Sequence, residues 1–109
     1  MFKFGTRSKE LLESVDPKLQ LIAKAALANS YVDFGVTTGY RDEQTQNRLH
    51  AEGKSKVRYP NGKHNQQPSE AIDVVAYVNG KATYELTYYI YLYGLFTGIA
   101  RSLGYGNRS

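Results

Sequence analysis

The sequence contains no cysteine and no tryptophan, and only two of its 109 residues are histidine. Without cysteine there is no disulfide framework, thiolate nucleophile or thiolate metal ligand. Imidazole chemistry is limited to His50 and His64. No apolar run approaches the roughly 20 residues of a membrane-spanning helix, and the N-terminal residues lack the apolar core of a secretory signal peptide. We therefore expect a protein made without a signal peptide, in a reducing compartment.

The composition is that of one small globular domain, and we take residues 1–109 as a single unit. Hydrophobic residues make up 41% of the chain and charged residues 22%, which is ordinary for a folded protein. Lysine and arginine outnumber aspartate and glutamate by 14 to 10, which gives a net charge of +4. This excess suits an anionic partner. The basic residues are scattered, however, so the sequence does not indicate a dedicated nucleic-acid-binding segment.

Hydrophobic periodicity predicts a few strands among helices, the pattern of an α+β fold with a small antiparallel sheet packed by helices. Ser8 is a candidate N-cap for the first helix, and Asp16-Pro17 is a typical helix start. The expected helices are 8–15, 17–29, 41–52 and 84–103, the expected strands are 31–37 and 71–78, and 54–69 is expected to be a loop with a short strand at 56–59.

The last helix is rich in tyrosine, and a 3.6-residue period predicts which of its side chains face the core. Asn79-Gly80, just before it, is typical of a tight hairpin turn. Tyr88 and Tyr91 fall outside the predicted stripe, whereas Tyr89 and Tyr93 lie on it. The stripe consists of Leu86, Tyr89, Ile90, Tyr93, Phe96, Ala100 and Leu103.

A histidine and an aspartate offer the clearest candidate site. His64 lies in the predicted loop, and Asp73 follows nine residues later within a strand, so the two side chains can converge. Imidazole and carboxylate together suit zinc. The ordinary alternatives are a solvated loop histidine and a buried, hydrogen-bonded aspartate. Arg41 is either a helix-surface residue or an oxyanion ligand, and Gln46 either faces solvent or donates a hydrogen bond to the site.

Several spaced blocks resemble one metallopeptidase family, the phage-type L-alanyl-D-glutamate endolysins and D-alanyl-D-alanine carboxypeptidases. The blocks are DFGVTTGYRDEQTQNRLHAEGKSKV, YPNGKHN and PSEAIDVVAY, and the leading SKELLESVDPKLQLIAKAAL also matches. The resemblance implies the D-Ala-D-Ala carboxypeptidase/hedgehog-like metallopeptidase fold and a Zn²⁺ cofactor. It places the first two zinc ligands at His64 and Asp73, a catalytic arginine at Arg41, and substrate-binding residues at Gln46 and Ser69.

The sequence departs from the family pattern at two points. Gly62 stands where the family usually has serine, two residues before the ligand histidine. The family's third zinc ligand, a histidine, and its acidic general base lie beyond the long helix, and neither has a matching position here. The general base is therefore unassigned. We expect the chain to correspond to the N-terminal part of the family domain, with a dimer or a complementing C-terminal chain as the candidate partners.

The resemblance implies zinc-dependent hydrolysis of an amide bond in peptidoglycan stem peptides, as in phage-mediated cell-wall lysis. It does not choose between endopeptidase and carboxypeptidase specificity. The alternative is a non-catalytic, truncated relative that binds cell-wall peptides or regulates a full-length lysin. A nucleic-acid-binding domain is supported by net charge alone. No nucleic-acid or membrane partner is expected, and a lysin of this kind would accumulate in the host cytoplasm and act on the wall after release.

Overall fold

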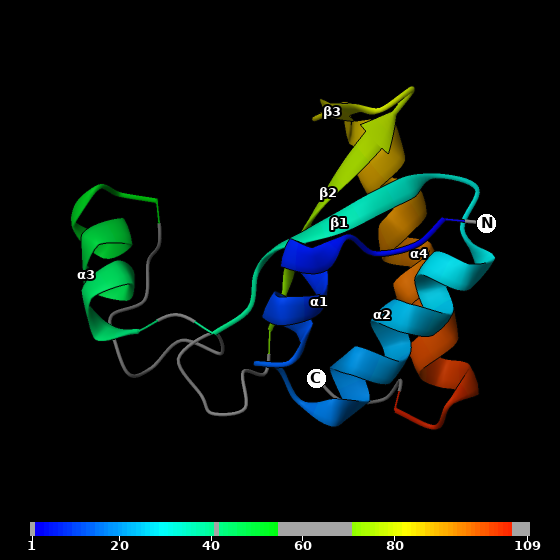
Figure 1. The fold of residues 1–109 in the computed structure, drawn as a ribbon, viewed down its shortest axis with the longest axis horizontal. Coiled ribbons are helices and arrows are strands. Elements are labelled where there is room, and N and C mark those ends of the chain that lie inside the picture. Colours follow the sequence, from blue (N-terminus) through cyan, green and yellow to red (C-terminus); the bar gives the residue numbers. More distant parts are fainter. Residues whose placement is uncertain (1, 41, 55–70, 106–109) are drawn as a thin grey trace.

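The computed structural model describes residues 2–40, 42–54 and 71–105, which form four helices and a small sheet (Figure 1). This arrangement confirms the predicted α+β class. The elements in chain order are α1 (Thr6–Leu12), α2 (Pro17–Asn29), β1 (Asp33–Thr38), α3 (Glu43–Ala51), β2 (Asp73–Val78), β3 (Lys81–Thr83) and α4 (Leu86–Ser102). None of the helices in these ranges is both long enough and apolar enough to cross a membrane.

The sheet is antiparallel, with β2 between β1 and β3. Asn79 and Gly80 connect β2 to β3 with φ angles of 54° and 78°, as a two-residue hairpin turn requires. The turn was predicted, but β3 was not. Its three residues are too few for an alternating pattern to stand out from the helix that follows.

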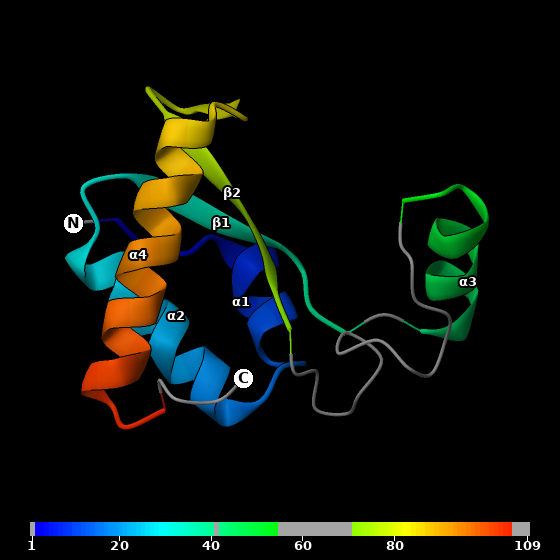
Figure 2. The same cartoon turned by 180° about the vertical axis from the view of Figure 1, so that it is seen from behind.

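The main core lies between the sheet and helices α2 and α4. Figure 2 shows α4 crossing one face of the sheet beside α2. Phe34 of β1 is 1% exposed, and its ring contacts those of Phe4 and Phe96, with centroids 5.6 and 5.4 Å away. Leu92 of α4 and Leu27 of α2 complete this cluster. Burying these side chains is the main favourable term in the stability of so small a domain.

Local signals predicted α2 with its correct limits, whereas α1 was predicted with the wrong cap and limits. Asp16 caps α2 by accepting a 2.8 Å hydrogen bond from the Lys18 N–H. Ser8, predicted to cap the first helix, lies inside α1, whose N-cap is Gly5. The buried Ser8 Oγ instead accepts a 2.9 Å bond from the Val36 N–H of β1. A cap and a tertiary hydrogen bond call for the same residue type, so sequence alone does not distinguish them.

The predicted core stripe of α4 is partly wrong. Tyr93 is 67% exposed, and three of the other six stripe members are also exposed, whereas Leu92 is 2% exposed. Tyr88 and Tyr91, placed off the stripe, pack against the core together with Tyr89. The helix is apolar on more than one face, so periodicity does not determine which face the sheet covers. The exposed stripe members are Leu86, Ile90, Tyr93 and Leu103.

Helix α3 confirms the predicted polar helix and stands apart from the sheet in both views (Figures 1 and 2). Asp42 caps its start, and Gly53, with a φ of 76°, follows its end. The loop predicted over 54–69 and its short strand at 56–59 fall almost wholly outside the described residues.

Candidate functional site

Asp73, the predicted carboxylate ligand, is the first residue of β2. Successive side chains in a strand point to opposite faces of the sheet, so the Asp73 side chain lies on the face opposite the core-facing Val74. The residue is half-buried. A β-bulge in β1 between Val36 and Thr38 shifts the register so that Thr38 pairs with Asp73. The Thr37 hydroxyl donates a 3.4 Å hydrogen bond to the Asp73 carbonyl oxygen. Bulges redirect side chains at the ends of strands, and this one fixes the backbone that carries the carboxylate.

The segment after β1 is held against α1 by one serine. Ser14 Oγ donates a 2.6 Å hydrogen bond to the Leu11 carbonyl oxygen and accepts a 3.0 Å bond from the Tyr40 N–H. Gly39 approaches so closely that an added Cβ would lie 2.4 Å from Ser14 Oγ and 2.6 Å from the Leu11 oxygen. Only glycine fits at this position. The Ser14 hydrogen bonds and the close packing of Gly39 fix the path of the chain just before Arg41, which itself lies outside the described residues.

Gln46 is buried, with 1% of the residue exposed. The solvent-facing alternative for this side chain is therefore wrong. It lies on α3, whose start is capped by Asp42 through a 2.8 Å hydrogen bond from the Thr45 N–H. Hydrogen bonds from Thr45, backbone first, lower the pKa of the Asp42 carboxyl. The helix that carries Gln46 stands apart from the strand that carries Asp73 (Figure 1).

The other three predicted site residues, Arg41, His64 and Ser69, lie outside the described residues. The pairing of His64 with Asp73 therefore stays a prediction. Within 2–40, 42–54 and 71–105, no three histidine, aspartate or glutamate side chains gather as they would around a metal ion. A carboxylate at a strand end and an imidazole from a preceding loop suit zinc by donor type. They make two ligands, one fewer than a catalytic zinc site ordinarily has.

Two positioning features of this region were missed by the sequence interpretation. Ser14 was given no role, and Thr37 was placed at the end of a regular strand over 31–37, without the bulge. Neither leaves a periodic signal, because each depends on a contact with a distant segment. Gly39 did carry a signal, since a glycine just after the predicted strand, two residues before Arg41, indicates the end of the strand pattern.

The sequence matches known proteins over nearly its whole length. Residues 1–108 match the family model described as phage L-alanyl-D-glutamate peptidase. The L-alanyl-D-glutamate peptidase of Escherichia phage T5 is 38% identical over 80 residues, which cover 73% of this chain and 58% of that protein. The chain thus matches less than two thirds of the length of this curated relative.

A solved structure shares the fold. The crystal structure of the Serratia marcescens L-Ala D-Glu endopeptidase ChiX superposes with a TM-score of 0.82 at 30% sequence identity. The match covers 94% of this chain and 74% of ChiX. The shared architecture and the family match together show that the chain belongs to the phage L-alanyl-D-glutamate peptidase family.

Proposed function

We propose that this chain forms the larger part of a zinc-dependent peptidase that hydrolyses the L-Ala–D-Glu bond of peptidoglycan stem peptides. The family match over residues 1–108 carries this proposal. The two relatives described above are both named for L-Ala–D-Glu cleavage, which favours this bond over the D-Ala–D-Ala bond. The substrate is in the cell wall, so the enzyme acts after release from the host cytoplasm.

His64 and Asp73 are the proposed zinc ligands, with Asp73 held at the bulged end of the sheet. When bound, zinc supplies Lewis acidity, which polarises a peptide carbonyl and makes water a better nucleophile near neutral pH. Arg41 is proposed to bind the substrate carbonyl oxygen, which gains negative charge during hydrolysis. Ser69 is proposed to orient the stem peptide, and the buried Gln46 to donate a hydrogen bond within the site. No described residue is assigned as general base.

The pairing of β2 with its two neighbouring strands indicates where a further polypeptide segment would complete the site. Strand β1 pairs with β2 from Asp73 to Tyr77, but β3 pairs only with Ala76–Val78. The Ala76 N–H donates a 3.1 Å bond to Tyr89 Oη, so it points away from β1. Alternation directs the backbone groups of Val74 to the same edge, where no described strand pairs with them.

An apolar groove lies beside this edge. Its volume is about 210 Å³, and one wall is the exposed ring of Tyr93 on α4. We propose that an extended segment from a complementing C-terminal chain pairs with β2 here and buries this wall, as in β-strand addition. The match spans 58% of the phage T5 protein and 74% of ChiX, so each relative has residues that this chain does not match. The groove is lined by Ile72, Val74, Tyr89, Leu92, Tyr93 and Phe96.

A second copy of the chain is the competing occupant of the groove, because exposed apolar patches promote association. Light scattering after size exclusion separates the two. A complementing chain predicts that the 109-residue protein is monomeric and becomes a 1:1 complex when the other polypeptide is added. A stable dimer without any addition would contradict the complementing-chain proposal.

Hydrolysis is tested with purified peptidoglycan and with a synthetic peptide containing the L-Ala–D-Glu bond, in the presence of zinc. The expected product is a new free amino group on D-glutamate, and the complementing polypeptide should increase its rate of formation. His64→Ala should abolish the reaction, whereas His50→Ala, on α3, should leave it unchanged. The non-catalytic alternative predicts peptide binding that persists with a chelator and no new amino group.

A further inference from the structure

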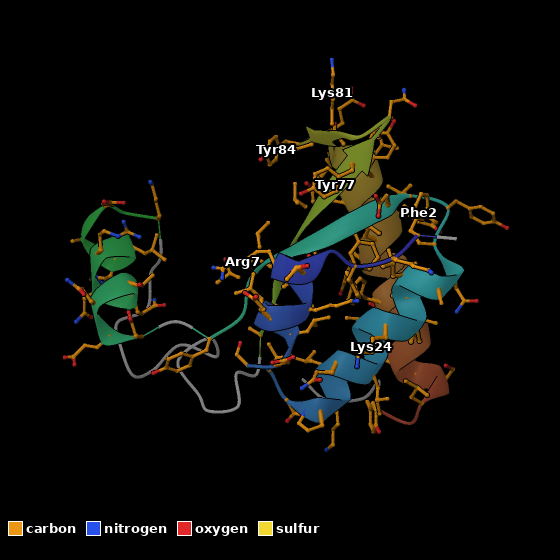
Figure 3. The ribbon with its side chains drawn as sticks, in the orientation of Figure 1. Phe2, Arg7, Lys24, Tyr77, Lys81 and Tyr84 are labelled. Atoms are coloured by element: carbon orange, nitrogen blue, oxygen red, sulfur yellow. The ribbon has the colours of Figure 1, made fainter. Side chains whose placement is uncertain are left out.

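An aromatic hollow lies at the end of the sheet opposite Asp73. It has a volume of about 420 Å³, within the roughly 300–1,000 Å³ typical of ligand pockets. In Figure 3, Tyr77 lies between Tyr84 on one side and Phe2 on the other. The hollow combines four aromatic rings with one carboxylate and one amide, and the residues that matter here are Phe2, Tyr31, Asp33, Tyr77, Asn79 and Tyr88.

Tyr31 is 91% exposed, yet its backbone is held in place. Its N–H donates a 2.9 Å hydrogen bond to Tyr91 Oη of α4. On the next residue, the Val32 N–H donates a 3.0 Å bond to Ser30 Oγ. The loop thus presents a large exposed ring from an ordered backbone. A rigid aromatic side chain of this kind provides contact area for a ligand at low entropic cost.

The ring of Tyr77 lies close to Gly35, its diagonal neighbour on β1. A Cβ on Gly35 would lie 3.3 Å from Cε2 of the Tyr77 ring and 3.7 Å from its hydroxyl oxygen, so the absent side chain leaves room for the ring across β1. Asp33 pairs directly with Tyr77 in the register of the two strands. The hollow therefore has a ring and a carboxylate side by side on the sheet.

This chemistry fits a sugar. A pyranose ring has an apolar C–H face that packs on aromatic rings, and its hydroxyl groups donate to carboxylate and amide oxygens. Among the residues that the structure describes, Asp33 lines the hollow and no lysine or arginine does, so the site favours a neutral ligand over an anionic one. Aromatic rings next to Asp33 and Asn79 thus match the two kinds of surface that a sugar presents.

We propose that this hollow binds the glycan strand of the cell wall through its neutral amino sugars. The inference rests on the proposed function, because it names a second part of the same substrate. Asp73 and Tyr77 are four residues apart on β2, which is roughly 13 Å of strand. A polymer whose peptides branch from its sugars can therefore lie with its glycan in the hollow and its peptide near Asp73.

The test is titration of the full chain with short β-1,4-linked N-acetylglucosamine oligomers, which are neutral glycans without peptide, followed by NMR. Wild-type protein should bind them, and Tyr31→Ala should weaken the affinity about three- to tenfold, as loss of one aromatic packing contact predicts. Tyr31→Phe, which keeps the ring, should bind nearly as well as wild type. Tyr84→Ala is the matched control, since Tyr84 is 81% exposed and does not line the hollow.

Absence of glycan binding by the wild type would overturn the inference, as would equal weakening by Tyr31→Ala and Tyr84→Ala. Failure of the proposed function has a different signature. It would appear as a lack of L-Ala–D-Glu hydrolysis while Tyr31-dependent glycan binding is retained. Hydrolysis of the peptide without any binding of peptide-free glycan would overturn the glycan site alone.

Discussion

Gly39 shows how a single residue can set the geometry at the end of a strand. Any larger side chain would collide with Ser14 Oγ and with the backbone of α1. We predict that Gly39→Ala lowers the free energy of unfolding by about 1–3 kcal/mol, the usual range for overpacking. Urea denaturation of wild type and variant measures the difference.

Gly94 is the matched control for this substitution. It lies in α4, and an added Cβ would meet nothing within 4 Å. Gly94→Ala should therefore raise the free energy of unfolding, by about 0.5–1 kcal/mol, because alanine favours the helix. Equal stability of Gly39→Ala and wild type would contradict the close approach of the two segments.

The Asp42 cap should make the stability of the start of α3 depend on pH. Hydrogen bonds from Thr45 lower the pKa of its carboxyl, so the cap stabilises the folded helix above the unfolded pKa of about 3.9. That stabilisation should be lost as pH falls through the lower folded value. NMR titration of the Thr45 amide should show a transition below the ordinary carboxyl pKa. In Asp42→Asn, which has no titrating carboxyl, this transition should vanish, and a midpoint above the ordinary pKa would contradict the account.

For single residues, the sequence predicted the caps and turns that depend only on neighbouring residues along the chain. The Asp16 cap and the Asn79-Gly80 turn are local, and both were predicted. The roles of Ser8 and Gln46 depend on segments distant in sequence, so the same residue types allowed more than one interpretation.

Tyr89 links two strands and a helix. Its hydroxyl accepts a 3.1 Å bond from the Ala76 N–H and donates a 2.7 Å bond to the Thr83 carbonyl oxygen. Tyr89→Phe would leave both backbone groups without this partner, and we predict a loss of about 1–3 kcal/mol. Amide exchange should report faster exchange at Ala76.

Tyr93→Phe is the control for Tyr89→Phe, since Tyr93 lies on the same helix and is 67% exposed. Its stability should match that of the wild type within about 0.5 kcal/mol. Equal effects of the two substitutions would mean that the Tyr89 hydroxyl does not hold β3 to β2.

The limits of the helices and strands were predicted better than the face of each that is buried. The alternation in β2 and the helical period in α4 gave both elements approximately correct limits. The core face of α4 was misplaced because Ile90 and Tyr93 are as apolar as the residues that pack on the sheet. Only the position of the sheet shows that Leu92 faces inward, and periodicity carries no information about that position.

For the whole molecule, the fold class and family were predictable because they depend on several spaced blocks together. The start of β2 at Asp73 confirms the strand on which the candidate site was built. The convergence of His64 on Asp73 stays a prediction, since it depends on how a loop returns to the sheet. Loop paths are set by tertiary contacts, which a sequence pattern does not specify.

The proposed activity requires His64 and Asp73 to share one zinc ion, and zinc titration of the 109-residue protein against a chromophoric chelator tests this directly. The wild type and His50→Ala should bind zinc with the same modest affinity, since two protein ligands hold a metal more weakly than three. His64→Ala and Asp73→Ala should each lower that affinity by about tenfold or more. Zinc binding that is unchanged in both variants would contradict the account.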